Sequence, residues 1–386
     1  MSKGGESMKE GWKKVKLGEV CDLYQPPTIS SKELKEDGLY DVFGANGIIG
    51  KYNKYNHIEP EILMTCRGAT CGNINVSTYK SWINGNAMVV HIKDTTELNF
   101  YYLKYLLSFI DKKNIITGAA QPQITRQTLA PILINYPSFE EQHRIVSILD
   151  ASFEKIDALK ANAEANLANA KALFQQVLAQ ELQPKEGWVE KKLEEIVAES
   201  CSLSYGIVQP GDDVVDGVPI IRPVDFNGKI FIKNKGLKKT KKEISDAYQR
   251  TILTGNEILM CVRGTTGTMG LATDELKGCN VTRGIVPILL NEKSDKLFVY
   301  YQLLSPLLQI QIAEKTKGAA LKQINIKDLR KIQLYMPIIA EQYRIVSTLD
   351  TLSEKCRRLE QVAQQTIREC DALKQSILRQ AFSGEL

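Results

Sequence analysis

The chain has 386 residues, of which 43% are hydrophobic and 25% charged, and this length predicts two or three domains with substantial cores. It contains no run of about 18 apolar residues and begins without an apolar signal segment, so we expect a cytoplasmic chain with no membrane span. The net charge is +5, and eight cysteines without a C-x-x-C pair, beside only three histidines, predict reduced buried thiols and no metal site.

Residues 1–137 are predicted to form a mixed α/β domain. Short apolar and β-branched runs such as "EILM" (61–64) and "AMVVHI" (87–92) are separated by Gly, Asn and Thr, as expected for strands joined by turns. The segment before Met8 resembles a flexible or vector-derived leader and is left out of the domain's core.

A long helix is predicted over residues 138–183, because this stretch contains neither Pro nor Gly. Pro137 precedes it, and Ser138 followed by Glu141 matches a capping box at its start.

The second half of the chain repeats the first. The matching segments are "EQHRIVSILD" (141–150) with "EQYRIVSTLD" (341–350), "EILMTCRGAT" (61–70) with "EILMCVRGTT" (257–266), and, without a gap, 117–150 with 317–350. This duplication predicts a second mixed domain over 184–337 and a second long helix over 338–386. Ile338 occupies the position of the Ser138 cap, so we expect a weaker cap there.

The two helices are expected to pair with each other as an antiparallel coiled coil. Steps of four and three along the first helix predict a mostly apolar stripe made of Ile145, Leu149, Ser152, Ile156, Leu159, Ala163, Asn166, Ala170, Leu173 and Val177. The positions 200 residues further on predict the matching stripe of the second helix. Because a whole domain connects the helices, they can run antiparallel, which predicts an α+β fold with pseudo-two-fold symmetry. The alternative is that each helix docks only on its own domain.

Positive charge lies mainly outside the helices. The helical segments hold 11 of the 50 Lys and Arg residues and 14 of the 45 Asp and Glu residues, so the remainder holds 39 against 31. This distribution favours a polyanionic partner for the mixed domains.

Motifs for catalysis fail in their details. "GANGIIGKY" (44–52) has Ala45 where a phosphate-binding loop needs its first Gly, and Tyr52 where that loop needs Ser or Thr. We find no Gly-rich dinucleotide turn, no "PPY"-type methyltransferase motif and no credible Ser-His-Asp or paired-carboxylate arrangement. The sequence therefore predicts a chain without catalytic or metal-binding residues.

Polar and basic residues in the mixed domains are candidates for contacts with DNA. Arg67 and Arg263 each follow an "EILM" strand, and Lys51 and Lys54 alternate with tyrosines. The remaining candidates are Gln121, Gln123, Arg126, Arg283, Lys322 and Gln323. Arginines can contact guanine or phosphate, and amides can contact adenine. An ordinary strand-end turn, a loop before the last strand and a solvated hairpin are the structural alternatives.

At this point the sequence resembles the specificity subunit of type I restriction-modification systems over nearly its whole length. The motifs that carry the resemblance are "GW..VKLGEV", "VFGANGIIGKY", "EILMTCRGATCG", "GAAQPQIT", "P..EEQHRIVSILD" with its repeat, and the ending "QAFSGEL".

The resemblance implies two target-recognition domains separated by two long antiparallel helices, and a bipartite double-stranded DNA target with a nonspecific gap. It implies no cofactor on this chain. Two methyltransferase subunits with S-adenosylmethionine, and restriction subunits using ATP and Mg²⁺, are the expected partners. The residues matching the family's helix-start motif, expected at a subunit or helix–domain interface, are Glu141, Gln142, Arg144, Glu341, Gln342 and Arg344.

Three alternatives stay open. The chain could serve a related bipartite-target system outside type I, it could be an enzyme with unrecognised methyltransferase motifs, or its mixed domains could bind protein in place of DNA.

Overall fold

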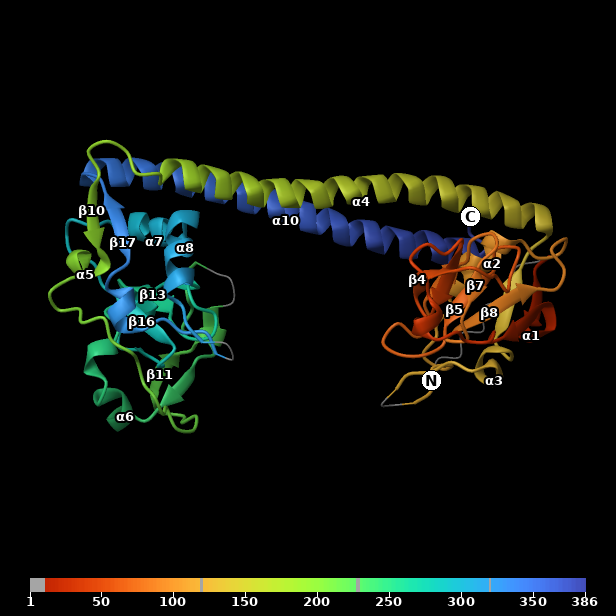
Figure 1. Cartoon of the computed structure of the whole chain (residues 1–386), viewed down its shortest axis with the longest axis horizontal. Coiled ribbons are helices and arrows are strands. Elements are labelled where there is room, and N and C mark those ends of the chain that lie inside the picture. Colours follow the sequence, from red (N-terminus) through yellow and green to blue (C-terminus); the bar gives the residue numbers. More distant parts are fainter. Residues whose placement is uncertain (1–10, 119–120, 227–229, 319–320) are drawn as a thin grey trace. The chain divides into compact units, whose positions relative to one another are not determined.

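The computed structural model describes residues 11–118, 121–226, 230–318 and 321–386. The chain folds as two compact units: unit 1 is Met1–Glu164 with Gln364–Leu386, and unit 2 is Ala165–Ala363. Each unit therefore contains one mixed domain and part of both long helices, α4 (Phe139–Glu181) and α10 (Ile339–Ser383) (Figure 1). The helix bounds lie within three residues of the predicted segments.

The described part of the unit 1 domain contains three small sheets, ordered β1–β9, β2–β8–β5–β6 and β4–β3–β7. The strands are β1 (Lys13–Lys16), β2 (Cys21–Tyr24), β3 (Tyr40–Gly44), β4 (Gly47–Tyr52), β5 (Ile62–Thr65), β6 (Ile74–Val76), β7 (Trp82–Ile83), β8 (Ala87–Ile92) and β9 (Leu133–Tyr136). The helices are α1 (Leu17–Val20), α2 (Phe100–Phe109) and α3 (Arg126–Leu129), with a 3-10 turn at Ser31–Glu33. The segment 44–52 forms the tip and second strand of the β3–β4 hairpin.

Unit 2 repeats this plan with the sheets β10–β17, β12–β11–β15 and β14–β13–β16. The strands are β10 (Val189–Lys192), β11 (Val218–Ile221), β12 (Lys238–Thr240), β13 (Ile258–Cys261), β14 (Met269–Leu271), β15 (Asn280–Val281), β16 (Ile285–Ile288) and β17 (Gln333–Met336). The helices are α5 (Leu193–Ile196), α6 (Lys242–Asp246), α7 (Lys296–Leu304), α8 (Pro306–Lys315) and α9 (Ile326–Leu329), with 3-10 turns at Pro223–Phe226, Gln249–Thr251 and Asp274–Leu276.

Each domain shares a hydrophobic core with the helices of its own unit. In unit 1, Leu149 of α4 and Leu378 of α10 are buried with Val90 and Tyr102 of the domain. In unit 2, the repeat-related Leu349 of α10 is buried with Leu178 of α4 and with Phe298 and Met260 of the domain. One domain, the start of one helix and the end of the other therefore form one core, which explains why neither helix is an independent element.

The helices run antiparallel within each unit. In unit 1, the Lys160 ammonium lies 2.6 Å from the Asp371 carboxylate, and Lys374 pairs with Asp157. In unit 2, Arg344 at the start of α10 lies 3.2 Å from Glu181 at the end of α4. The predicted mixed domains, antiparallel helices and internal repeat are thus confirmed.

The predicted stripe along the helices is only partly right. Ile145, Leu149, Ile156, Ala163 and Ala170 are buried as expected. However, the predicted Leu159 and Leu173 are 53% and 45% exposed, as are Leu359 and Leu373 at 55% and 49%.

The position next to the exposed leucine explains the error. From Ile156 onward the buried positions follow a step of four and then a step of three, where the prediction used three and then four. Lys160 and Phe174 are therefore half-buried in place of Leu159 and Leu173. The aliphatic stem of Lys160 covers the seam while its ammonium reaches Asp371 on the other helix. A search for apolar residues alone therefore selects the wrong neighbour.

Candidate nucleic-acid interface

In unit 1, the turn after β5 lies against the loop that precedes α3. The backbone N–H of Gly68 donates to Pro122 O at 3.1 Å, and that of Ile124 donates to Cys66 O at 2.9 Å. These bonds place Arg67 directly opposite Gln123, and both side chains are exposed. Gly68 has φ +87, a conformation that favours glycine. Two candidates that lie 56 positions apart in the sequence thus share one surface.

The same arrangement recurs in unit 2. Gly264 N–H donates to Lys322 O at 2.8 Å, and Ile324 N–H donates to Val262 O at 2.9 Å. Arg263 consequently lies opposite Gln323, with the exposed Lys322 beside it.

Both loops are closed by their own backbone. Thr117 and Gln123 exchange two backbone hydrogen bonds of 2.8 Å, as do Lys317 and Gln323. At Gly118, φ is +85 and an added Cβ would lie 2.4 Å from Gln121 O, so a side chain there is excluded. Gln123 and Gln323 are therefore each held by backbone hydrogen bonds where the loop closes.

Three candidates in unit 1 lie outside this pairing. Arg126 is exposed at the first position of α3, after the Thr125 cap. Lys51 lies on β4, five residues beyond the Ala45–Asn46 turn at the hairpin tip, with its ammonium 3.9 Å from Asp41. The exposed Lys54 follows the strand. The tip itself contacts the Arg67 region, because Thr65 donates to Ala45 O. The two lysines are therefore separate from the Arg67–Gln123 surface.

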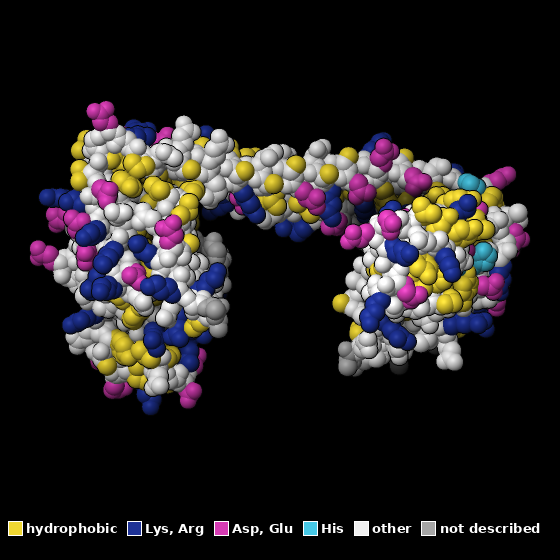
Figure 2. All heavy atoms as spheres, in the orientation of Figure 1, with side chains coloured by type: hydrophobic (Ala, Val, Ile, Leu, Met, Phe, Trp, Pro, Cys, Tyr) yellow, Lys and Arg dark blue, Asp and Glu magenta, His cyan; other side chains and the backbone are white. Residues whose placement is uncertain are grey.

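In unit 2, Arg222, Arg263 and Arg283 line one surface depression of about 390 Å³. Arg222 donates to Asp225 through Nε at 3.1 Å and Nη2 at 2.9 Å. The Nε of Arg263 is buried and has no hydrogen-bond partner among the described residues. On the face shown in Figure 2, Lys and Arg side chains are spread over the domain of unit 2 among hydrophobic and acidic ones.

Sequence reasoning missed Arg222. The sequence does contain evidence for it: "VPIIRP" (218–223) aligns with "YDVFGA" (40–45) of the first repeat, so that Arg222 stands where the first repeat has Gly44. The two repeats differ too much in this region for the substitution to stand out without the strand register.

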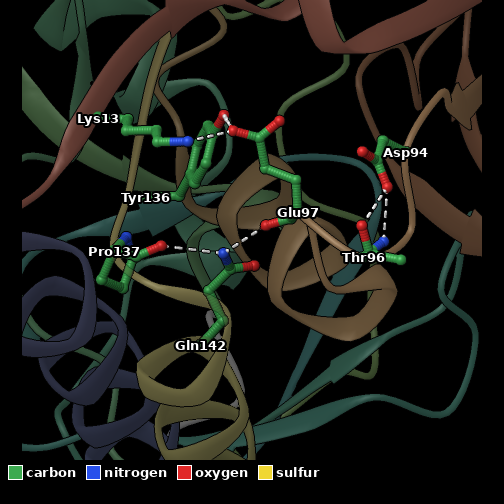
Figure 3. A network of polar contacts seen from close by, with 7 residues as sticks. All are labelled: Lys13, Asp94, Thr96, Glu97, Tyr136, Pro137 and Gln142. Carbon is green, nitrogen blue, oxygen red and sulfur yellow. Dashed lines mark hydrogen bonds and ion pairs between the residues drawn. The ribbon is translucent and has the colours of Figure 1, made fainter.

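The helix-start motif holds each domain to its helix. Gln142 is fully buried: its amide nitrogen donates to Glu97 O at 2.9 Å and Pro137 O at 3.0 Å, and its oxygen accepts from Asn99 N at 2.8 Å (Figure 3). The Glu97 side chain is bonded to Lys13, which lowers the pKa of this carboxyl, and accepts from Tyr136 at 3.2 Å. Strands β1 and β9, helix α2 and helix α4 therefore meet at one polar network.

Gln342 makes the corresponding bonds in unit 2. Its nitrogen donates to Lys293 O at 3.2 Å and Pro337 O at 2.9 Å, and its oxygen accepts from Asp295 N at 2.8 Å. The repeated Gln is therefore a helix–domain contact in both units.

Comparison with known proteins assigns the chain to a family. Residues 9–168 and 185–369 both match the model of the type I restriction modification DNA specificity domain. The chain belongs to this specificity family. It is similar to the type I restriction enzyme EcoBI specificity subunit of Escherichia coli, with 26% identity over 98% of this chain and 87% of the relative. The MjaVIII specificity subunit of Methanocaldococcus jannaschii is 22% identical over 99% of this chain and 94% of that protein.

Solved structures show the same fold. A chain from work on complex assembly and conformational transition of the type I restriction-modification system has a TM-score of 0.77 at 20% identity, covering 98% of this chain and all of that one. The HsdS subunit from Thermoanaerobacter tengcongensis has a TM-score of 0.55 at 20% identity, with both chains fully covered. The resemblance noted from the sequence is confirmed: this is a DNA-recognition subunit, and the alternatives outside type I are not favoured.

The Glu–Arg pair of the helix-start motif joins the helices of the specificity chain. Arg144 donates to both carboxylate oxygens of Glu141 at 2.7 Å and to Leu386 O at 2.7 Å. Arg344 holds Glu341 in the same way, at 2.8 Å, and reaches Glu181 at 3.2 Å. The start of α4 is thereby bonded to Leu386, just beyond the end of α10, and the start of α10 is bonded to the end of α4.

The starts of the two helices differ as predicted in their caps. The Ser138 hydroxyl accepts from Glu141 N at 3.4 Å, whereas Ile338 provides only its carbonyl, which accepts from Glu341 N at 3.0 Å.

The exposed leucines of the long helices α4 and α10 form matched pairs. In unit 1, the ion pairs of Lys160 with Asp371 and of Asp157 with Lys374 bring Leu159 and Leu373 to the same level of the helix pair. The repeat places Leu359 and Leu173 in the corresponding positions of unit 2. Each unit thus exposes two leucines on its described parts of α4 and α10.

Other features of the specificity chain concern metals and membranes. Within the described ranges, no three His, Cys, Asp or Glu side chains gather as a metal site. No described helix is both long and apolar enough to cross a bilayer. All eight cysteines are free, and burial raises the pKa of Cys21 to about 12 and that of Cys66 and Cys261 to about 11.

Proposed function

We propose that each mixed domain of this specificity subunit reads one half of an asymmetric bipartite DNA target, while the long helices set the gap. The observation that carries the proposal is the repeated surface built from a strand-end Arg and a loop Gln, Arg67 with Gln123 and Arg263 with Gln323. One backbone frame is used twice with different neighbouring side chains. This arrangement suits two recognition sites that bind different DNA sequences.

The basic side chains and the amide side chains have different roles in binding DNA. Exposed lysines such as Lys54 and Lys322 neutralise phosphates and supply sequence-independent affinity that falls as salt rises. The Arg and Gln side chains of the paired turn and loop reach base edges in the major groove and supply the choice of sequence.

The helices act as a spacer and a docking surface. Helix α4 has 43 residues and is about 64 Å long at ~1.5 Å per residue. The exposed leucine pairs, Leu159 with Leu373 and Leu173 with Leu359, are repeated once per unit and fit two copies of one partner. We assign these copies to two methyltransferase subunits.

Catalysis belongs to the partners in this proposal. The chain contributes recognition, the methyltransferase subunits bind S-adenosylmethionine, and restriction subunits that use ATP and Mg²⁺ join the complex. The family assignment supports this division, since the matching model describes a DNA specificity domain.

Gel shifts test the proposal directly. The chain is co-expressed with its methyltransferase subunit, and binding to a duplex carrying the mapped methylation motif is compared with binding to a random duplex. We expect tighter binding to the motif, and replacement of Arg67 or Arg263 by Ala should reduce this preference. Equal affinity for both duplexes, or binding of S-adenosylmethionine by the purified chain alone, would contradict the proposal.

A further inference from the structure

The two recognition surfaces differ in chemistry at equivalent places, and this difference indicates which bases they read. Resting on the proposed function, we infer that unit 2 reads guanine through Arg263 and Arg283, whereas unit 1 reads adenine through amide side chains around Arg67.

Strand register defines the equivalent positions. Val42 and Phe43 pair with Trp82 and Ile83 in unit 1, and Ile220 and Ile221 pair with Asn280 and Val281 in unit 2. The residues following these pairs are therefore equivalent: Gly44 with Arg222, Gly85 with Arg283, and Asn86 with Gly284. Arg67 is equivalent to Arg263, and Gln121 to Leu321.

Unit 2 concentrates guanidinium groups in its depression. Arg222 is neutralised by Asp225, but no described carboxylate pairs with Arg263 or Arg283. The buried Nε–H of Arg263 cannot donate to water and donates to no described acceptor, and an unpaired buried donor destabilises the free protein. The guanidinium groups of Arg263 and Arg283 thus suit a ligand with two adjacent acceptor atoms, and the O6 and N7 atoms of guanine are such a pair.

The walls of the depression favour a base edge over a phosphate. They include Ile207, Val208, Pro223 and Leu321, whose apolar surfaces suit a flat ring better than a hydrated phosphate. Gly264 leaves space at the rim, since nothing lies within 4 Å of an added Cβ. The Arg283 backbone is held by a hydrogen bond from its N–H to Ile207 O at 2.8 Å.

Unit 1 has Gly44 and Gly85 in place of Arg222 and Arg283, keeps Arg67 in place of Arg263, and offers amide side chains nearby. The segments that pack beside the Arg67 turn carry four exposed amide side chains, those of Gln25, Asn86, Gln121 and Gln123. Gln25 Nε2 donates to Gly85 O at 2.8 Å, Asn86 O accepts from Cys66 N at 3.2 Å, and Gln123 lies opposite Arg67. Asn and Gln form bidentate hydrogen bonds with the N6 and N7 atoms of adenine.

The experiment uses the complex of this chain with its methyltransferase subunit. Methylation motifs are mapped for the wild type and for Arg263→Ala, Arg283→Ala and, as the repeat-matched control, Arg67→Ala. We expect the first two variants to relax guanine positions in one half-site only, and Arg67→Ala to affect only the other. The half-site left intact by the Arg263 and Arg283 changes should contain adenine.

Modified DNA provides a second readout that does not depend on folding of the variants. Wild-type complex is titrated with duplexes in which each guanine of the unit 2 half-site is replaced by 7-deazaguanine, which lacks the N7 acceptor but keeps Watson–Crick pairing. We expect a loss of affinity on the order of 10- to 100-fold at the guanine read by Arg263 or Arg283.

The outcomes separate this inference from the proposed function. A bipartite motif whose unit 2 half lacks guanine, or 7-deazaguanine without effect at every position, would overturn the inference alone. Equal weakening of Arg263→Ala on target and random duplexes would identify a phosphate contact and also overturn it. Absence of any bipartite motif would overturn both.

Discussion

Replacing Gln142 by Ala tests the contact that joins the first domain to its helix. The change removes the acceptor of Asn99 N–H and the donor for the Glu97 and Pro137 carbonyls. All three partners are backbone groups near a fully buried side chain, so removal leaves them unpaired. Asn99 also caps α2 by accepting from Tyr101 N and Tyr102 N, so the loss weakens the start of that helix too.

The expected cost follows from the number of groups left unpaired. Each buried polar group without a partner costs about 1–3 kcal/mol, and water that enters the space left by the side chain can satisfy some of the three groups. We therefore expect the free energy of unfolding to fall by about 3–5 kcal/mol. This is a large share of the ~5–15 kcal/mol that stabilises a typical domain. Gln142→Glu should cost at least as much, because a carboxylate would face two carbonyl oxygens.

Urea unfolding followed by tryptophan fluorescence measures the effect on unit 1. Of the three tryptophans, Trp12 and Trp82 lie in unit 1 and Trp188 in unit 2, so a Trp188→Phe background reports on unit 1. Gln375→Ala, at an exposed position of α10 in unit 1, is the matched control and should change stability by less than about 0.5 kcal/mol. The reasoning is refuted if Gln142→Ala behaves like this control.

Three further predictions concern the helices. Inserting one heptad between Ala161 and Ala170, with a matching heptad in α10, should lengthen the DNA gap by ~10 Å or about three base pairs and leave both half-sites unchanged; altered half-sites in the methylation map would contradict the spacer role. Leu159→Asp should weaken methyltransferase binding in a pull-down without changing the thermal unfolding of the chain; unchanged binding would exclude this surface. The Cys356 thiol is buried in the helix seam whereas Cys71 is half-buried, and burial raises the pKa of both thiols. Because iodoacetamide reaches Cys356 less readily, it should modify this thiol more slowly than Cys71 at pH 8, as mass spectrometry can show; equal rates would mean that the helix seam opens readily.

Sequence alone predicted the features that duplication and periodicity encode. The repeated decapeptides at 141–150 and 341–350 predicted paired helices, and the "EILM" runs correctly located β5 and β13. The seam needed the structure, because Lys160 lies in it through its aliphatic stem while Leu159 is exposed. Hydrophobicity of single residues does not distinguish these two positions.

The candidate site was predicted in parts. Arg67 and Gln123 were each selected for their chemistry, but only the backbone pairing shows that they lie opposite each other. Lys51 was selected on the same grounds and lies elsewhere on the hairpin. Arg222 was missed because its equivalent is Gly44, and strand register is needed to align the two.

Methylation mapping of a host that carries this chain and its methyltransferase subunit tests the central claim most directly. We predict a single asymmetric motif made of two short specified half-sites separated by a gap of fixed length and unspecified sequence. A single uninterrupted recognition sequence, or a motif that stays the same when this chain is absent, would contradict the claim that the two domains read separate half-sites.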